Sequence, residues 1–74
     1  MLEPKVVVGR NIKRIRESQD LTQEAAAHRC EVHPVEFARA ERGVRDMRVS
    51  TVAKIAKGLR VPAAELMAGI GRKR

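Results

Sequence analysis

The chain has 74 residues, of which 16 are Lys or Arg and 9 are Asp or Glu, so its formal net charge is +7. A chain of this length forms one domain with a thin hydrophobic core, which leaves no room for a catalytic domain beside a regulatory one. Phe37 is the only aromatic residue, and this excludes the stacking platforms on which single-strand binders hold bases. The composition therefore favours a polyanionic partner, and duplexes over single strands.

The remaining composition is typical of a cytoplasmic protein. The longest apolar runs, such as VVV at 6–8, are far too short to span a membrane, and the N-terminus lacks the apolar stretch of a signal peptide. The single cysteine, Cys30, cannot form an internal disulfide. We therefore expect a reducing, cytoplasmic setting.

The first helix signal is Pro4, which suits the first turn of a helix. Val8, Ile12 and Ile15 follow at helical spacing and predict a helix over about residues 5–18. The β-branched valines at 6–8 could equally begin a strand. No segment of the chain alternates as a half-buried strand does, so we expect an all-α protein.

The stretch at 21–43 predicts two short helices joined by a tight link. Thr22 is a good N-cap for a helix that runs to about residue 29. Pro34 is suited to open the next helix, and Gly43 to end it. This is the layout of a helix-turn-helix, whose second helix can enter a DNA major groove.

Two more helices are predicted after a loop over 44–48. The apolar residues of the first recur at inward spacing: Val49, Val52, Ile55, Ala56 and Leu59. Pro62 then opens a last helix over about residues 62–69. We therefore expect a compact five-helix bundle in one DNA-binding domain over residues 1–70, and a basic C-terminal tail over 71–74.

The order of these segments resembles the Cro and phage-repressor-like helix-turn-helix regulators, the XRE family. The motifs that carry the resemblance are IKRIR at 12–16, LTQE at 21–24, ERG at 41–43 and VAKIAKGLRV at 52–61. The resemblance covers about residues 8–67 and implies a helix-turn-helix at the second and third helices. RDM at 45–47 is similar to the corresponding segment of restriction–modification controller proteins, a branch of small dimers.

The resemblance implies roles for three residues of the scaffold. Gln23 matches a glutamine at the start of the second helix that hydrogen-bonds a DNA phosphate, and helix N-termini suit phosphates. Arg16 and Glu41 match an arginine–glutamate pair that links the first helix to the end of the third. We expect this pair to be a structural clamp rather than a DNA contact.

Members of this family read bases with residues at the start of the third helix and one turn later. These positions hold His33, Pro34, Val35, Glu36 and Arg39. Arg39 is the best candidate, because a guanidinium can donate two parallel bonds to guanine O6 and N7. Pro34 and Val35 offer apolar contact, while Glu36 can accept a bond from cytosine or orient Arg39.

We expect phosphate contacts from the side chains that flank this helix: Thr22, Gln23, Arg42, Arg45 and Arg48. Simple solvation is the expectation for three other cations: Lys5, Lys54 and Lys57.

Several positions depart from the family pattern. Glu31 stands where the turn usually holds a glycine, so a strained left-handed residue is expected there. Ala26 replaces a leucine and leaves space that Phe37 can fill. His33 replaces the usual serine or threonine, and Met47 the usual proline.

His28, Cys30 and His33 have the residue types of a zinc site at short spacing. No fourth ligand is evident, so we expect Cys30 to be a small buried residue of the turn, with a zinc site or a redox-active thiol as alternatives. We predict no metal and no cofactor. The chain has neither a glycine-rich phosphate loop nor a nucleophile–base pair, and we expect no enzymatic activity.

The leading interpretation is a transcriptional regulator that binds double-stranded DNA as a homodimer on a near-palindromic operator and represses by occluding polymerase. The predicted dimer interface is Leu66, Met67 and Ile70. The alternative is a protein-interaction module, antitoxin-like or coactivator-like, that retains the fold.

Overall fold

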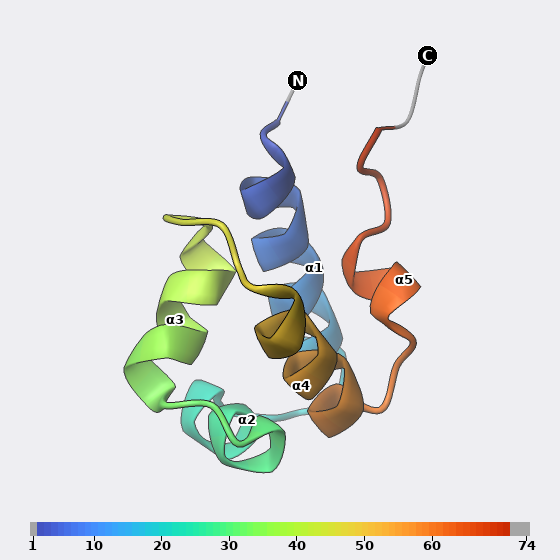
Figure 1. Cartoon of the computed structure of the whole chain (residues 1–74). Coiled ribbons are helices and arrows are strands. Elements are labelled where there is room, and N and C mark those ends of the chain that lie inside the picture. The colour runs from blue at the N-terminus through green and yellow to red at the C-terminus, as the bar shows by residue number, and fades with distance from the viewer. Residues whose placement is uncertain (1, 72–74) are drawn as a thin grey trace.

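The structure, a computed structural model, describes residues 2–71 and consists of helices and their connections. The helices are α1 (Pro4–Ser18), α2 (Gln23–Cys30), α3 (Pro34–Arg42), α4 (Val49–Leu59) and α5 (Ala63–Leu66). Figure 1 shows α1 between α3 and α5, with α4 packed across the front and α2 at the base. No strand occurs in residues 2–71, so the all-α prediction is confirmed.

α1 begins at Pro4 and includes the three valines that could have begun a strand. Val8, Ile12 and Ile15 face the core and are at most 5% exposed. The helical spacing of these residues therefore outweighed the β-branched run, because burying one apolar stripe requires the helical register.

A glycine in the middle of α1 lets it approach α3 closely. A Cβ on Gly9 would lie 2.5 Å from the carbonyl oxygens of both Ala40 and Glu41. Only a residue without a side chain fits there. The contact seats the last turn of α3 directly against α1.

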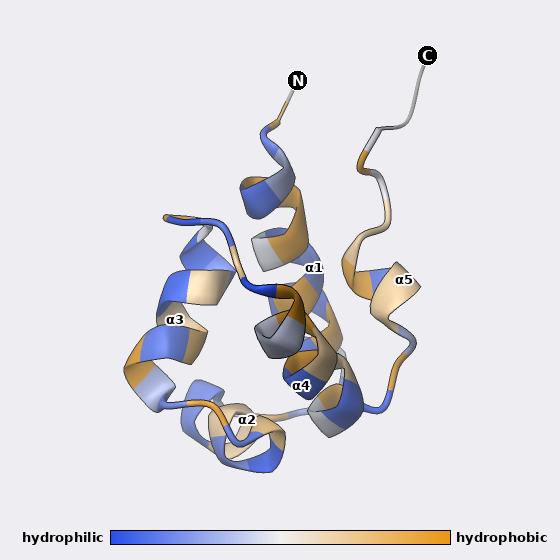
Figure 2. Ribbon diagram, in the orientation of Figure 1, coloured by the Kyte–Doolittle hydropathy of each residue, from blue (hydrophilic) through white to orange (hydrophobic). Residues whose placement is uncertain are grey.

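The core lies where the five helices meet, and its fully buried side chains are Phe37, Ile12, Ile55, Leu59 and Leu66. Ala26 is also wholly buried and belongs to the same cluster as Phe37, as expected if the ring fills the space beside a small residue. Figure 2 shows that hydrophilic and hydrophobic residues alternate along the ribbons of the helices and that hydrophilic residues make up much of the loop between α3 and α4.

Local signals define the ends of α2 and α3. Thr22 Oγ1 accepts a hydrogen bond from the Ala25 backbone N–H at 3.0 Å. Glu31 ends α2 with φ 58° and ψ 41°, the expected left-handed conformation without a glycine. Gly43 ends α3 with φ 68°. Because both helices begin and end at defined residues, the turn holds α3 at a fixed place on the bundle.

Two expectations for the second half of the chain were wrong. Val49 is 86% exposed rather than inward, because the buried stripe of α4 begins only at Ile55. The last helix is shorter than predicted, and the chain continues from Met67 in turns that include Gly69 at φ 96°. Of the predicted basic tail, residues 72–74 lie outside the described residues.

No helix in residues 2–71 is both long enough and apolar enough to cross a bilayer.

Candidate nucleic-acid interface

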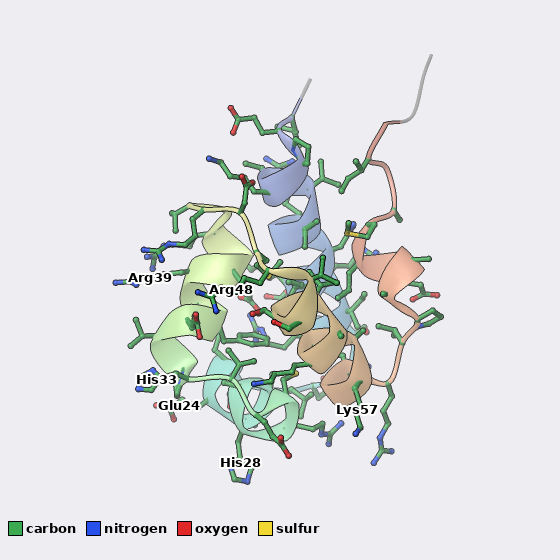
Figure 3. The ribbon with its side chains drawn as sticks, in the orientation of Figure 1. Glu24, His28, His33, Arg39, Arg48 and Lys57 are labelled. Atoms are coloured by element: carbon green, nitrogen blue, oxygen red, sulfur yellow. The ribbon has the colours of Figure 1, made fainter. Side chains whose placement is uncertain are left out.

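α3 presents all five predicted base-reading residues on its outer side: His33, Pro34, Val35, Glu36 and Arg39 are exposed. The opposite side of α3 carries Phe37, Ala40 and Glu41 into the core. Figure 3 shows Arg39 projecting away from the body of the protein. The surface is therefore free to enter a groove without disturbing the core.

A hollow of about 240 Å³ lies between α3 and the loop that leads to α4. Three arginines line it, namely Arg39, Arg45 and Arg48, together with the carboxylates Glu36 and Asp46. The structure thus brings the predicted base-reading arginine beside two of the predicted phosphate-binding arginines. Asp46 was not predicted as a site residue, although it belongs to the RDM segment at 45–47.

The arginines of this surface are not neutralised by the protein itself. Arg39, Arg42, Arg45 and Arg48 are exposed, and across residues 2–71 none of them pairs with a carboxylate within 4.0 Å. Glu36 therefore does not orient Arg39 through an ion pair. Exposed cations that are not paired within the protein favour binding to phosphate.

His33 replaces the usual hydroxyl side chain and takes over its capping role. Its Nδ1 accepts a hydrogen bond from the Val35 backbone N–H at 3.1 Å. Since Nδ1 acts as the acceptor, Nε2 carries the proton. The ring thus offers an exposed N–H donor at the tip of α3.

Gln23 and Glu41 belong to a polar cluster at the junction of α1, α2 and α3. Glu41 accepts from Arg16 Nε at 2.5 Å and Arg16 Nη2 at 3.2 Å, and Arg16 Nη1 donates to the Leu21 carbonyl at 2.7 Å. Gln23 Nε2 donates to Glu41 Oε1 at 2.8 Å. The buried ion pair therefore also holds the amide of Gln23, at the exposed start of α2.

Thr22 lies beside this amide. Because its Oγ1 already accepts a hydrogen bond from Ala25, the hydroxyl proton remains available for a second acceptor. Thr22 and Gln23 are both exposed and stand next to the free N–H groups of the first turn of α2. Such a terminus is suited to a phosphate group.

Cys30 lies in the core rather than at this surface. It is 2% exposed, and its Sγ donates to the Ile55 carbonyl oxygen at 3.6 Å. Burial raises the pKa of the Cys30 thiol above its ordinary value, with a smaller opposing effect from Arg29. His28 and His33 are exposed, and no three ligand side chains within residues 2–71 are grouped to hold a metal.

The three residues of the predicted dimer interface differ in their burial within the single chain. Leu66 has no exposed surface, because it packs into the monomer core, and Asn11 Nδ2 donates to its carbonyl oxygen at 2.8 Å. Met67 is 43% exposed, and Ile70 is partly buried. The spacing of apolar residues in a short helix does not predict which of them will be buried in the core.

Comparison with known proteins agrees with this architecture. A family model described as a helix-turn-helix domain matches residues 7–68, while no curated protein matches the sequence. The chain is 26% identical to the restriction-modification controller protein C.AhdI from Aeromonas hydrophila, with a TM-score of 0.80 over 84% of this chain and 94% of that one.

Two further solved structures are similar. An HTH_3 family transcriptional regulator from Vibrio cholerae is 27% identical with a TM-score of 0.84, over 90% of this chain and 38% of that one. The hypothetical transcription factor NHTF from Neisseria is 25% identical with a TM-score of 0.83, over 88% of this chain and 75% of that one. The resemblance to XRE-like regulators is thereby confirmed, and the chain belongs to the helix-turn-helix domain family.

Proposed function

We propose that this protein is a sequence-specific transcriptional regulator that binds double-stranded DNA as a homodimer. The observation that carries the proposal is the outer surface of α3, where exposed base-reading candidates, Arg39 among them, adjoin three further arginines that pair with no carboxylate of residues 2–71. Direct readout needs a helix that enters the major groove, and binding strength needs cations beside it for the phosphates. This surface supplies both.

The proposed division of roles follows the geometry. Arg39 reads a base, with His33, Pro34, Val35 and Glu36 around it. The residues proposed to bind phosphate are Thr22, Gln23, Arg42, Arg45 and Arg48. A protein with a net charge of +7 also gains from counterion release when it binds a duplex.

The proposed dimer interface lies on the apolar surface around Met67 and Ile70. These residues line a hollow of about 230 Å³ with Met47 and Val52, and the exposed Val49 lies one turn before Val52 on α4. Two copies related by a two-fold axis would address half-sites about 34 Å apart on one side of the duplex. Binding at a promoter would repress by occluding polymerase.

Selection of bound sites from a random duplex pool tests the proposal. The expected result is an enriched, near-palindromic sequence with half-sites about one helical turn apart. Sedimentation of the complex should give two protein chains per site. Failure to bind random duplex at low salt would contradict DNA binding and favour the protein-interaction module instead.

A further inference from the structure

A second basic surface lies at the C-terminal ends of α2 and α4. Arg29, Lys54, Lys57 and Arg60, here called the α2–α4 basic cluster, line a hollow of about 300 Å³ together with Glu31. All four cations are exposed, and over residues 2–71 none of them has a carboxylate within 4.0 Å. The cluster is therefore a concentration of positive charge that the described part of the protein leaves unpaired.

The cluster faces away from the surface assigned to DNA. Figure 3 shows Arg39 and Lys57 on opposite sides of the molecule, and no residue of α3 lines the hollow. None of the residues assigned to phosphate binding lines the hollow either. The cluster thus remains open to another partner while α3 is occupied.

One of the four cations, Arg60, has a strained backbone conformation at the rim of the hollow. Arg60 ends α4 with φ 61° and ψ 43°, in the left-handed region that glycine adopts most easily. A glycine would remove this strain but also the guanidinium. Asp20 and Glu31 share this conformation, so Arg60 is distinguished by the position of its guanidinium at the hollow rather than by the strain itself.

Helix dipoles account for only part of this charge. Cations near a helix C-terminus are stabilised by about half a negative charge at that end. Arg29 and Lys57 lie in the last turns of α2 and α4, but Lys54 lies a turn earlier. Four cations exceed what two helix ends and the carboxylate of Glu31 can balance.

The floor of the hollow is a close contact between α2 and α4. A Cβ on Gly58 would collide with Cys30 Sγ and with the Cys30 backbone, so α2 and α4 meet here without an intervening side chain. The cations consequently stand around a fixed depression rather than on a mobile loop. A single projecting side chain can enter such a depression, whereas the phosphates of a duplex lie along a wide, stiff surface.

We propose that the α2–α4 basic cluster docks an acidic segment of a partner protein, with one Asp or Glu side chain in the hollow. Charge complementarity selects this partner, because the cluster carries four donors and an excess of positive charge. The proposal goes beyond DNA binding and rests on it only in stating that the segment and a duplex bind at the same time.

A fluorescein-labelled octapeptide of glutamate is the probe, and octaglutamine is the uncharged control. We expect the peptide to bind the free protein and also the protein saturated with random duplex. In amide spectra of the isotopically labelled protein, its addition should shift signals of Arg29, Glu31, Lys57 and Arg60 rather than those of α3.

Two matched double variants and one glycine variant test the site. The double variant Lys57→Glu/Arg60→Glu should lower peptide affinity at least tenfold more than Arg10→Glu/Lys13→Glu, which reverses two exposed cations outside the hollow. Arg60→Gly should lower peptide affinity about threefold or more while leaving the midpoint of thermal unfolding unchanged or higher, because it relieves the left-handed strain.

The outcomes separate this proposal from DNA binding. Equal peptide losses in the two double variants, amide shifts confined to α3, or displacement of the peptide by duplex would each overturn it. So would an Arg60→Gly protein that melts earlier and still binds the peptide, since the cation would then serve only the helix end. Loss of duplex affinity in Lys57→Glu/Arg60→Glu beyond that of the control would assign the cluster to DNA. If no duplex binds but the free protein binds the peptide here, the DNA proposal fails and the docking site stands.

Discussion

Gln23 Nε2 lies 2.8 Å from Glu41 Oε1, and this bond connects the exposed start of α2 to a buried carboxylate of α3. The same carboxylate pairs with Arg16 of α1, so three helices meet at one side chain. A rigid scaffold for a surface contact is thus built from a core ion pair. The arrangement makes the stability of the fold and the orientation of Gln23 separately testable.

Removing either partner of the ion pair should strongly destabilise the protein. Arg16 and Glu41 are 9% and 8% exposed, so Glu41→Gln leaves a buried guanidinium with only the more distant carboxylate of the exposed Glu17, at 3.9 Å. We expect a loss of about 3–5 kcal/mol in the free energy of unfolding, measured by urea denaturation. Arg16→Met/Glu41→Leu should recover much of that loss, because no buried charge remains. Additive losses in the double variant would contradict the clamp.

Gln23→Ala should weaken binding to specific and random duplexes alike. The protein loses one phosphate contact, but Glu41 keeps both of its bonds from Arg16, so stability should change little. Because glutamine is uncharged, the slope of log affinity against log salt should stay the same. Titrations at several salt concentrations check this. A loss confined to one operator sequence would instead make Gln23 a base-reading residue.

Arg39→Ala and Arg45→Ala should have different effects on DNA binding, the first on sequence preference and the second on affinity for all duplexes. Arg39→Ala should cost about 1–3 kcal/mol on the selected operator and relax preference at one base position. Arg45→Ala should weaken all duplexes equally and reduce the salt slope by about 0.9. Repeating the site selection with each variant distinguishes them. If Arg39→Ala lost the same affinity for operator and random duplex, its base-reading role would be refuted.

Substitutions at the neighbouring residues Met67 and Leu66 should affect different properties, dimerisation at Met67 and stability at Leu66. Met67→Glu places a charge on a 43% exposed position and should shift the protein towards monomer with little change in unfolding free energy. Leu66→Ala empties a fully buried position and should cost about 2–5 kcal/mol. Sedimentation equilibrium and denaturation measure the two effects. An unchanged dimer in Met67→Glu would place the interface elsewhere.

Cys30 should react slowly while the protein is folded. Burial raises the pKa of its thiol, so less of the nucleophilic thiolate is present at about pH 8 than in a free cysteine. Disulfide-exchange labelling should be slow in buffer and fast in denaturant. Because the unfolded thiol ionises first, the free energy of unfolding should fall as pH rises through the ordinary thiol range. Rapid labelling of the native protein would contradict this prediction and favour the alternative that Cys30 is a redox-active thiol.

The sequence by itself determined the helices and most of their ends. Thr22, Pro34 and Gly43 act through the backbone within a few residues, so their effect is readable before any packing is known. The order of the motifs was also sufficient to predict the all-α architecture and the exposed position of Arg39. These features depend on periodicity and capping, which are local properties.

Only the tertiary structure decided which apolar residues the core takes and which polar groups meet. The spacing in α4 could not show that Val49 lies outside, nor that Leu66 is wholly buried. The sequence did not predict that Gly9 lies directly against α3, nor that Gln23 donates a hydrogen bond to Glu41. Each of these depends on the distance between helices far apart in the chain, and such distances are set by the packing of the whole bundle rather than by neighbouring residues.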